Sequence, residues 1–181
     1  MLSCGAPTGY PLPYIYWVVQ TEDGEIKSID NPRMTVDPEG NLWYSNVTRD
    51  DASESSFYVC VASSIFLNEY KLGARIKLQV IPSDTLEFIP PTKQYLSSEN
   101  IVSESDKKIE LFCIYGGSPL PEIEWLKNNE LIQFEVRVKT GNYGKSLVIR
   151  RSIDADTGNY TCQASNGNGE DQFNNINLQI E

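Results

Sequence analysis

Residues 156–162 read Asp-Thr-Gly-Asn-Tyr-Thr-Cys, and this stretch decides the fold. It ends in the triplet Tyr160-Thr161-Cys162, and the first half of the chain holds a matching triplet, Tyr58-Val59-Cys60. One cysteine and then one tryptophan precede each triplet: Cys4, Trp17, Cys113 and Trp125. Both halves therefore carry a cysteine, a tryptophan, and a tyrosine two places before a second cysteine, which marks an internal repeat.

This order of residues is typical of the immunoglobulin β-sandwich, in which a disulfide joins two sheets and a tryptophan packs against it. The tyrosine before the second cysteine forms the tyrosine corner of that fold. The pattern predicts one disulfide in each half, Cys4 with Cys60 and Cys113 with Cys162. The expected core tryptophans and corner tyrosines are Trp17, Trp125, Tyr58 and Tyr160.

Alternation of apolar and polar residues supports an all-β fold. It is present in 74–80, 108–113 and 175–180, as in half-buried antiparallel strands. Runs rich in Gly and Asn mark turns at 39–41 and 166–169. No stretch shows a sustained helical period. We therefore expect two tandem immunoglobulin-like sandwiches of the I-set type.

The expected domains are residues 1–81 and 90–181, joined by a linker at 82–89. The linker leads into the pair Pro90-Pro91, which we expect to stop sheet pairing. The chain starts at the strand that carries Cys4, so we expect an N-terminally truncated fragment whose first domain lacks its first strand. That domain would expose one sheet edge and be less stable than a complete one.

Charge and composition exclude several classes of function. The chain has 25 acidic and 15 basic residues and a net charge of −10, so we expect no nucleic-acid partner. It has no histidine, which removes the usual catalytic bases, and its four cysteines suit disulfides in an oxidising compartment. We expect no enzyme activity, metal or cofactor. No apolar run reaches the roughly 20 residues of a membrane helix, so membrane attachment is expected only through parts absent from this chain.

Two sequons, Asn46-Val47-Thr48 and Asn159-Tyr160-Thr161, are candidate N-glycosylation sites. We expect Asn46 to be exposed near a strand end. Asn159 should point outward because its neighbour Tyr160 points inward. The alternative for each is an unused sequon.

Charged residues near the corners have a structural interpretation. We expect Arg33 with Asp51, and Arg137 with Asp156, to bridge the bottom of each sandwich. The first corner should be looser than the second, because additional residues separate Asp51 from Tyr58. The run Asp154–Gly158 resembles the start of a calcium loop but lacks its closing Glu, so a corner turn is favoured.

Two sites are candidates for protein contacts. Trp43 lies between Leu42 and Tyr44; if these face the core, Trp43 faces outward and could form a contact, unless neighbouring side chains shield it. The apolar run Ile65-Phe66-Leu67 should lie in the loop between the last two strands of the first domain. It forms either an interface or a small satellite core.

Longer runs resemble a known family. Residues 33–49, 109–121 and 143–150 are similar to the invertebrate neural cell adhesion molecules of the immunoglobulin superfamily. The resemblance covers nearly the whole chain and implies the second and third immunoglobulin domains of a larger, single-pass cell-surface glycoprotein.

The resemblance implies calcium-independent homophilic adhesion between cells in neural development, axon guidance and cell junctions. Its implied partners are a second copy on an apposed cell and other immunoglobulin-superfamily surface proteins. Two alternatives stay open, a soluble immunoglobulin-type immune recognition protein and a heterophilic receptor ectodomain. Surface complementarity multiplied by avidity would be the mechanism.

Overall fold

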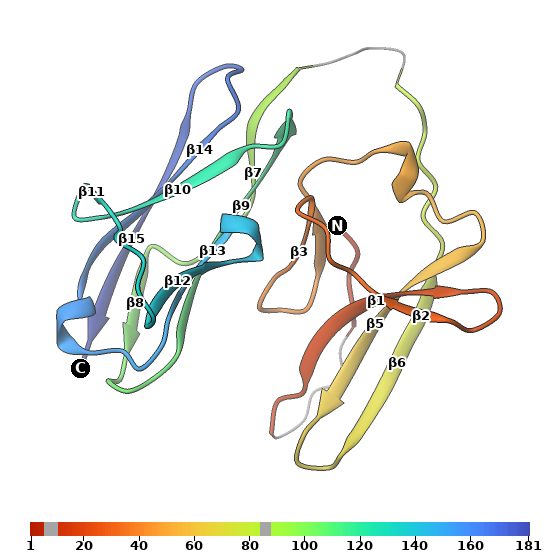
Figure 1. Ribbon diagram of the computed structural model, residues 1–181, viewed down its shortest axis with the longest axis horizontal. Helices are drawn as coiled ribbons and strands as arrows, with labels where there is room; N and C mark the ends of the chain where they lie inside the picture. Colours follow the sequence, from red (N-terminus) through yellow and green to blue (C-terminus); the bar gives the residue numbers. More distant parts are fainter. Residues whose placement is uncertain (6–10, 84–87) are drawn as a thin grey trace. The chain divides into compact units, whose positions relative to one another are not determined.

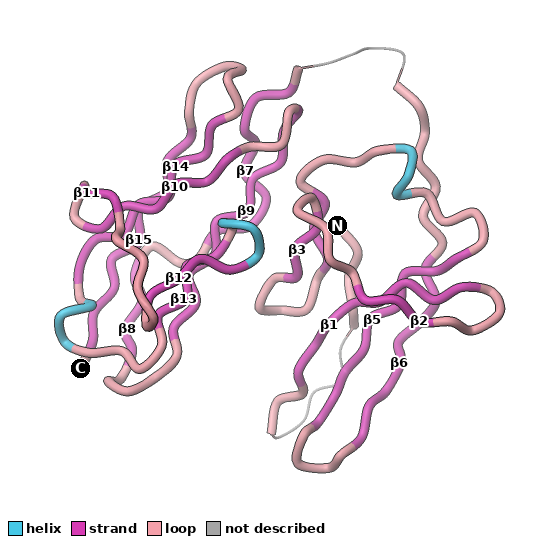
Figure 2. Tube along the Cα trace, viewed as in Figure 1, coloured by secondary structure: helices cyan, strands magenta, loops and turns pink. Residues whose placement is uncertain are grey.

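The computed structural model describes residues 1–5, 11–83 and 88–181, and Figure 1 labels its strands in chain order. The chain divides into two compact units, residues 1–86 and 87–181, each with its own core. Strands dominate both units (Figure 2). The helical segments of the described residues are short 3-10 turns: η1 (Arg49–Asp51), η2 (Asn142–Gly144) and η3 (Asp154–Asp156). The prediction of an all-β fold is confirmed.

In the described part of the first unit, six strands form two sheets. The larger sheet has the order β2-β1-β5-β6 with antiparallel neighbours, and β3 pairs with β4 in the smaller one. The strands are β1 (Tyr14–Thr21), β2 (Ile26–Ser28), β3 (Met34–Val36), β4 (Leu42–Tyr44), β5 (Ser56–Ser64) and β6 (Glu69–Ile76). A buried cluster between the sheets contains Cys4, Trp17, Leu42, Tyr44, Tyr58 and Cys60.

The segment around Cys4, where a strand is expected, pairs with β4 through one isolated bridge. Leu2 donates its N–H to the Leu42 carbonyl at 2.8 Å and accepts the Leu42 N–H at 2.9 Å. Within residues 1–5 this bridge is the only strand-like pairing that the structure assigns. The expected strand is thus corrected to a single bridge, which still holds Cys4 against the core at 4% exposure.

The last strand of the first unit departs from the prediction of residues 74–80. It begins at Glu69, ends at Ile76, and lies at the edge of its sheet. All of its residues except Ile76 are exposed, and no other strand of the described residues pairs with its outer edge. The alternation seen in the sequence survives only as the half-buried side chains of Ile76, Leu78 and Val80.

A β-bulge interrupts the pairing of β5 with β6. Val59 lies opposite Arg75 and Val61 lies opposite Leu72, so two residues of β6 share the place opposite Cys60. Cross-strand partners lie on the same face of a sheet. The bulge therefore brings Leu72 and Arg75 to one face, although they are three places apart in the sequence.

In the second unit, described from residue 88 onward, nine strands form a complete sandwich. One sheet has the order β11-β10-β14-β15-β8, with β8 parallel to β15, and the other has the order β12-β13-β9-β7. The strands are β7 (Ile89–Leu96), β8 (Asn100–Ser103), β9 (Ile109–Ser118), β10 (Glu122–Lys127), β11 (Glu130–Leu131), β12 (Val138–Gly141), β13 (Ser146–Ile149), β14 (Gly158–Ser165) and β15 (Gln172–Ile180).

The first strand of this unit corrects the expectation about the proline pair. β7 begins at Ile89, which the prediction places in the linker, and runs through both prolines. It pairs Ile89 with Ser118 and Thr92 with Gly116, and the register shifts over the prolines between these pairs. Because β7 is an edge strand, the missing N–H groups are tolerated. Residues 84–87 of the predicted linker lie outside the described residues.

Candidate functional site

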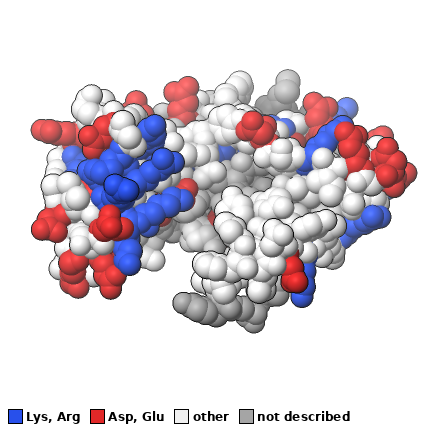
Figure 3. All heavy atoms as spheres, turned by 60° about the horizontal axis from the view of Figure 1, so that its bottom comes forward, with Lys and Arg blue, Asp and Glu red and all other residues white. Residues whose placement is uncertain are grey.

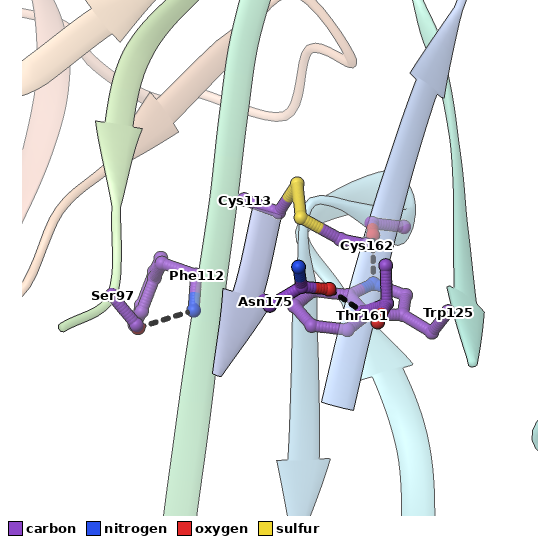
Figure 4. Close-up of a disulfide and its surroundings, with 8 residues drawn as sticks. Ser97, Phe112, Cys113, Trp125, Thr161, Cys162 and Asn175 are labelled. Carbon is purple, nitrogen blue, oxygen red and sulfur yellow. Dashed lines mark hydrogen bonds between the residues drawn. A yellow bond between two sulfur atoms is a disulfide. The ribbon is translucent and has the colours of Figure 1, made fainter. Parts of the chain in front are cut away.

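A disulfide braces the core of each unit, Cys4–Cys60 in the first and Cys113–Cys162 in the second. Trp17 lies directly opposite Cys60 in the pairing of β1 with β5. Trp125 lies directly opposite Cys162 in the pairing of β10 with β14, and its ring lies beside the disulfide (Figure 4). The two tryptophans are 3% and 2% exposed. Both braces therefore have the same construction.

Each buried indole also makes a hydrogen bond that links its sheet to the opposite one. Trp17 donates its indole N–H to the Gly40 carbonyl at 2.8 Å, and Trp125 donates to the Gly144 carbonyl at the same distance. Both glycines lie in the turn between the second sheet's neighbouring strands and have a positive φ, +88° and +90°. The role of these turns was not predicted, although the sequence has a Gly in each loop after the tryptophan.

The tyrosine corners are present in both units. The Tyr58 hydroxyl donates to the Asp51 carbonyl at 3.0 Å, and the Tyr160 hydroxyl donates to the Asp156 carbonyl at 2.7 Å. The additional residues before Tyr58 are therefore accommodated without loss of the hydrogen bond. Burial raises the pKa of both hydroxyls, so they remain protonated donors at neutral pH.

An arginine clasps the aspartate at each corner. The Arg33 guanidinium donates to both carboxylate oxygens of Asp51, at 2.5 and 2.7 Å, and the Thr48 amide donates to the same carboxylate at 2.7 Å. Burial would raise the pKa of Asp51, but these donors outweigh it and the pKa lies below its usual value. The clasp holds the turn that leads into β5.

The second unit repeats the clasp with Arg137 and Asp156. The two guanidinium contacts measure 2.7 and 3.1 Å, and the Ile153 amide donates to the carboxylate at 2.9 Å. The start of the calcium-like run therefore lies in η3, where the Asp156 carboxylate is engaged by Arg137. Among the described residues no group of three or more acidic, Cys or His side chains could hold a metal ion.

The structure places the two sequons differently. Asn159 is exposed on β14, and its main-chain N–H donates to Oδ1 of Asn128 at 3.0 Å. Asn46 is half-buried rather than exposed, because it follows β4 beside the clasp and its carbonyl accepts a hydrogen bond from Arg33 at 2.9 Å.

Trp43 is shielded within its own unit. Leu42 and Tyr44 face the core as expected, at 1% and 7% exposure, so Trp43 points to the other side of β4. Its indole N–H donates to the buried Asp37 carboxylate at 2.8 Å, and the ring is half-buried. Asp37 also accepts the backbone N–H of Asn41 at 2.9 Å. The side chain thus fixes the β3–β4 turn, and its polar atom has a partner without any second molecule.

The apolar run in the β5–β6 turn is the most exposed apolar feature of the predicted sites. Ile65, Phe66 and Leu67 are 90%, 84% and 66% exposed, so they do not form a satellite core. Figure 3 looks toward the end of the first unit that carries this turn and shows a broad uncharged area there. The satellite core is thus excluded, and the interface at this run stays a prediction.

A second apolar surface, which the sequence analysis missed, covers the side of sheet β2-β1-β5-β6 that faces away from Trp17. We call it the outer face. Its members on β1, β5 and β6 are Tyr14, Tyr16, Val18, Phe57, Val59, Val61, Tyr70 and Leu72. Val18, Val59 and Val61 are at most 4% exposed because the aromatic rings around them cover them.

A sequence signal for this surface exists. Strands that bury one face alternate, whereas those covered on both faces read as near-continuous apolar runs. Residues 14–19 and 57–62 have no polar member that breaks them, in contrast to 175–180. These two runs therefore predict an apolar layer on both sides of the sheet.

Comparison with known proteins shows where this architecture belongs. The chain is 49% identical to neuroglian of Drosophila melanogaster over 99% of its own length and 14% of that protein. The chain is a neuroglian-like protein of the immunoglobulin superfamily. The immunoglobulin I-set domain model matches residues 93–180 of this neuroglian-like chain, within the second unit.

Hemolin of Hyalophora cecropia is 28% identical to the neuroglian-like chain over 99% of the chain and 45% of hemolin. The crystal structure of the insect immune protein hemolin aligns with a TM-score of 0.89 at 26% identity, over 99% of this chain and 48% of that one. The chain thus spans less than half the length of these relatives. No helix of the described residues is long and apolar enough to cross a membrane.

Proposed function

We propose that this chain is part of the extracellular portion of a single-pass cell-surface protein and mediates calcium-independent homophilic adhesion. The observation that carries the proposal is the exposed apolar turn Ile65–Leu67 on a disulfide-braced sandwich. A contiguous exposed apolar patch is typical of a protein interaction site. The similarity to neuroglian, and to hemolin, whose structure is described with implications for homophilic adhesion, supports the same conclusion.

The chemistry of the described residues favours contact over catalysis. The buried carboxylates of Asp51 and Asp156 are held by arginines, and the buried tyrosine hydroxyls donate to main-chain carbonyls. Calcium-independent adhesion fits a surface whose acidic residues form no metal-binding group among the described residues. Weak contacts of this kind gain strength when many copies meet between two membranes. Neural development, axon guidance and cell junctions are the proposed settings.

The test is aggregation of beads coated with the complete ectodomain, compared with an ectodomain that lacks residues 1–181, with and without a calcium chelator. Clumping that persists in chelator and is lost on deletion supports the proposal. A triple variant, Ile65→Ser with Phe66→Ser and Leu67→Ser, should reduce clumping. Val136→Ser is the matched control, because Val136 is 85% exposed in the second unit. Intact beads that never clump would overturn the homophilic assignment.

A soluble immune recognition protein is the second candidate, favoured by the similarity to the immune protein hemolin. The two candidates differ in membrane anchorage. Expression of the complete parent gene in cultured cells, followed by surface staining and by assay of the medium, separates them. Protein held on the cell surface supports the adhesion assignment, and protein found only in the medium supports the immune one.

We also propose that Asn46 and Asn159 carry N-glycans, together with an extracellular location. The exposure of Asn159 on β14 supports glycosylation there, whereas Asn46 is half-buried after β4 and its proposal rests on the sequon. Mass spectrometry of the secreted chain, with Asn46→Gln and Asn159→Gln as controls, measures the occupancy of each site. Loss of one glycan mass in each variant is the expected result.

A further inference from the structure

The outer face of the first unit is apolar where the equivalent face of the second unit is polar. In the first unit the pairs Tyr16–Val61 and Val18–Val59 stack along β1 and β5. The corresponding pairs of β10 and β14 are Glu124–Gln163 and Leu126–Thr161. Thr161 in turn donates to the Asn175 side chain at 2.7 Å, as Figure 4 shows. The two sandwiches of this chain thus differ: the outer face is apolar in the first unit, and the equivalent face is polar in the second.

The apolar face continues to the end of the sheet that carries the β5–β6 turn. Tyr14 and Tyr70 flank Ser63 on either side, and they are 67% and 66% exposed. Leu72 is 44% exposed beside buried Val61. Large exposed aromatic and aliphatic side chains around a desolvated centre are the composition of an interface core.

The opposite end of the same face carries charge of both signs, separated across the sheet. Arg75, on the β6 side, donates to Gln20 at 2.9 Å and lies 5.3 Å from the centre of the Phe57 ring. Lys77, just beyond β6, lies 5.9 Å from the centre of the same ring. The acidic residues are in the β1–β2 turn, at the other edge of the sheet: Glu22, Asp23 and Glu25.

These positions make the outer face complementary to itself. Consider a two-fold axis that lies in the plane of contact and runs parallel to the strands. It places each end of one sheet against the same end of the other sheet. It places each edge of one sheet against the opposite edge of the other. The β6 cations of one copy then lie opposite the acidic β1–β2 turn of the other, twice per dimer. The tyrosine-rich ends meet each other, and the valine centres are covered. An axis perpendicular to the strands would instead place the charged end of each copy against the tyrosine-rich end of the other.

We infer that the outer face of the first unit is a self-docking surface, on which a second copy of the chain packs face to face with its strands parallel. This inference rests on the proposed homophilic function and names the contact surface for it. The charge pattern argues for a second copy over a foreign partner, because one surface carries both halves of the complementary pattern. It also offsets the repulsion expected between chains of net charge −10.

The size of the face predicts a weak contact. β1, β5 and β6 have eight, nine and eight residues, and β2 has three. The three long strands measure roughly 26 by 14 Å, and with β2 the face covers about 400 Å² in projection. A standard stable interface buries about 800 Å² from each partner. The dimer therefore belongs to the transient class and would depend on the turn Ile65–Leu67 and on avidity for its strength.

The first experiment is sedimentation of the two-domain chain over a concentration series. Tyr70→Glu should weaken dimerisation about tenfold or more, because a charge replaces an exposed ring at the contact. Val136→Glu is the matched control, an exposed apolar residue of the second unit that becomes acidic. Unchanged thermal unfolding shows that Tyr70→Glu folds. A Tyr70→Glu chain that dimerises like the parent overturns the inference.

The second experiment exchanges charges. Lys77→Glu alone and Glu22→Lys alone should each weaken the dimer about tenfold, because each reversed contact occurs twice. The double variant restores opposite charges across the interface and should regain the parental affinity. Lys139→Glu, an exposed strand residue of the second unit, controls for net charge. Failure of the double variant to recover affinity overturns the parallel arrangement.

Bead aggregation with the same variants separates this inference from the proposed function. Clumping of parental beads together with loss in Tyr70→Glu supports both. Clumping that survives Tyr70→Glu and Lys77→Glu leaves adhesion standing and overturns the outer face as its surface. Resistance of the Tyr14 and Tyr70 side chains to covalent labelling in the dilute monomer would show that another part of the protein covers the face, which also overturns self-docking.

Discussion

Trp17 donates its indole N–H to the carbonyl of Gly40 at 2.8 Å, and the turn that holds Gly40 is packed against the strand of Trp17. A Cβ atom at Gly40 would lie 2.8 Å from Cγ2 of Ile15, which is also on β1. The equivalent glycine of the second unit, Gly144, has its nearest such neighbour at 3.7 Å. The glycine that accepts this hydrogen bond therefore has no room for a side chain in the first unit, whereas the equivalent glycine of the second unit has room for one.

Alanine at these two glycines should separate backbone strain from crowding. Both glycines have a positive φ, so Gly40→Ala and Gly144→Ala each lose about 1–2 kcal/mol. Gly40→Ala should lose about 1–3 kcal/mol more, because the added methyl overpacks against Ile15. Urea unfolding, read for each unit by amide hydrogen exchange, measures both. Equal losses in the two variants would contradict the crowding.

Asp51 should stabilise the first unit in a pH-dependent way. Its side chain is 2% exposed and clasped by Arg33, so Asp51→Asn should cost about 3 kcal/mol by leaving a partly buried guanidinium unpaired. The folded-state pKa is lowered, so this stabilisation is complete above the unfolded pKa of about 4 and is lost as pH falls through the folded pKa.

Unfolding of the parent and of Asp51→Asn at pH 7 and pH 3 measures this dependence, and the difference should shrink at pH 3. Glu25→Gln is the control. Glu25 pairs with Lys27 at 3.5 Å, but both side chains are about 60% exposed, and such pairs contribute under about 1 kcal/mol. A difference between parent and Asp51→Asn that does not change with pH would refute the assignment.

Lys145 should make the second unit more stable at alkaline pH. The residue is 3% exposed, and burial lowers the pKa of its ammonium group to about 8. The unfolded chain holds the proton up to pH about 10.4, so between these values it binds more protons than the folded chain. Stability therefore rises with pH across this window. Lys145→Met should flatten the rise, measured by urea midpoints at pH 7.5 and 9.5.

Gly73 should tolerate no side chain. It lies in the bulge opposite Cys60, and a Cβ atom there would be 2.7 Å from the Cys60 sulfur and 3.2 Å from its carbonyl oxygen. Gly73→Ala should destabilise the first unit by about 1–3 kcal/mol. Gly5→Ala is the control, since nothing lies within 4 Å of a Cβ at Gly5. A neutral Gly73→Ala would mean that β6 moves freely away from β5.

The fold class could be predicted because its signals are local. A tyrosine two places before a cysteine, and apolar residues at every second position, depend only on neighbours in the sequence. The hydrogen-bond partner of Trp43 could not be predicted, because Asp37 lies on the other side of the β3–β4 turn. The geometry of that turn cannot be read from the sequence. The extent of β6 was wrong because the alternation that begins at Tyr70 continues to Val80, past Ile76, where the strand ends.

The bulge in β6 limits how copies of this chain can associate. An edge strand with regular spacing would accept a strand from another molecule, and that molecule would offer its own edge to a third. Gly73 and Ala74 share one place opposite Cys60, between Leu72 and Arg75, so a regular ladder cannot continue outward there. Strand addition at the β6 edge is thereby blocked, and a face that closes on one partner leaves a finite pair instead of a fibre.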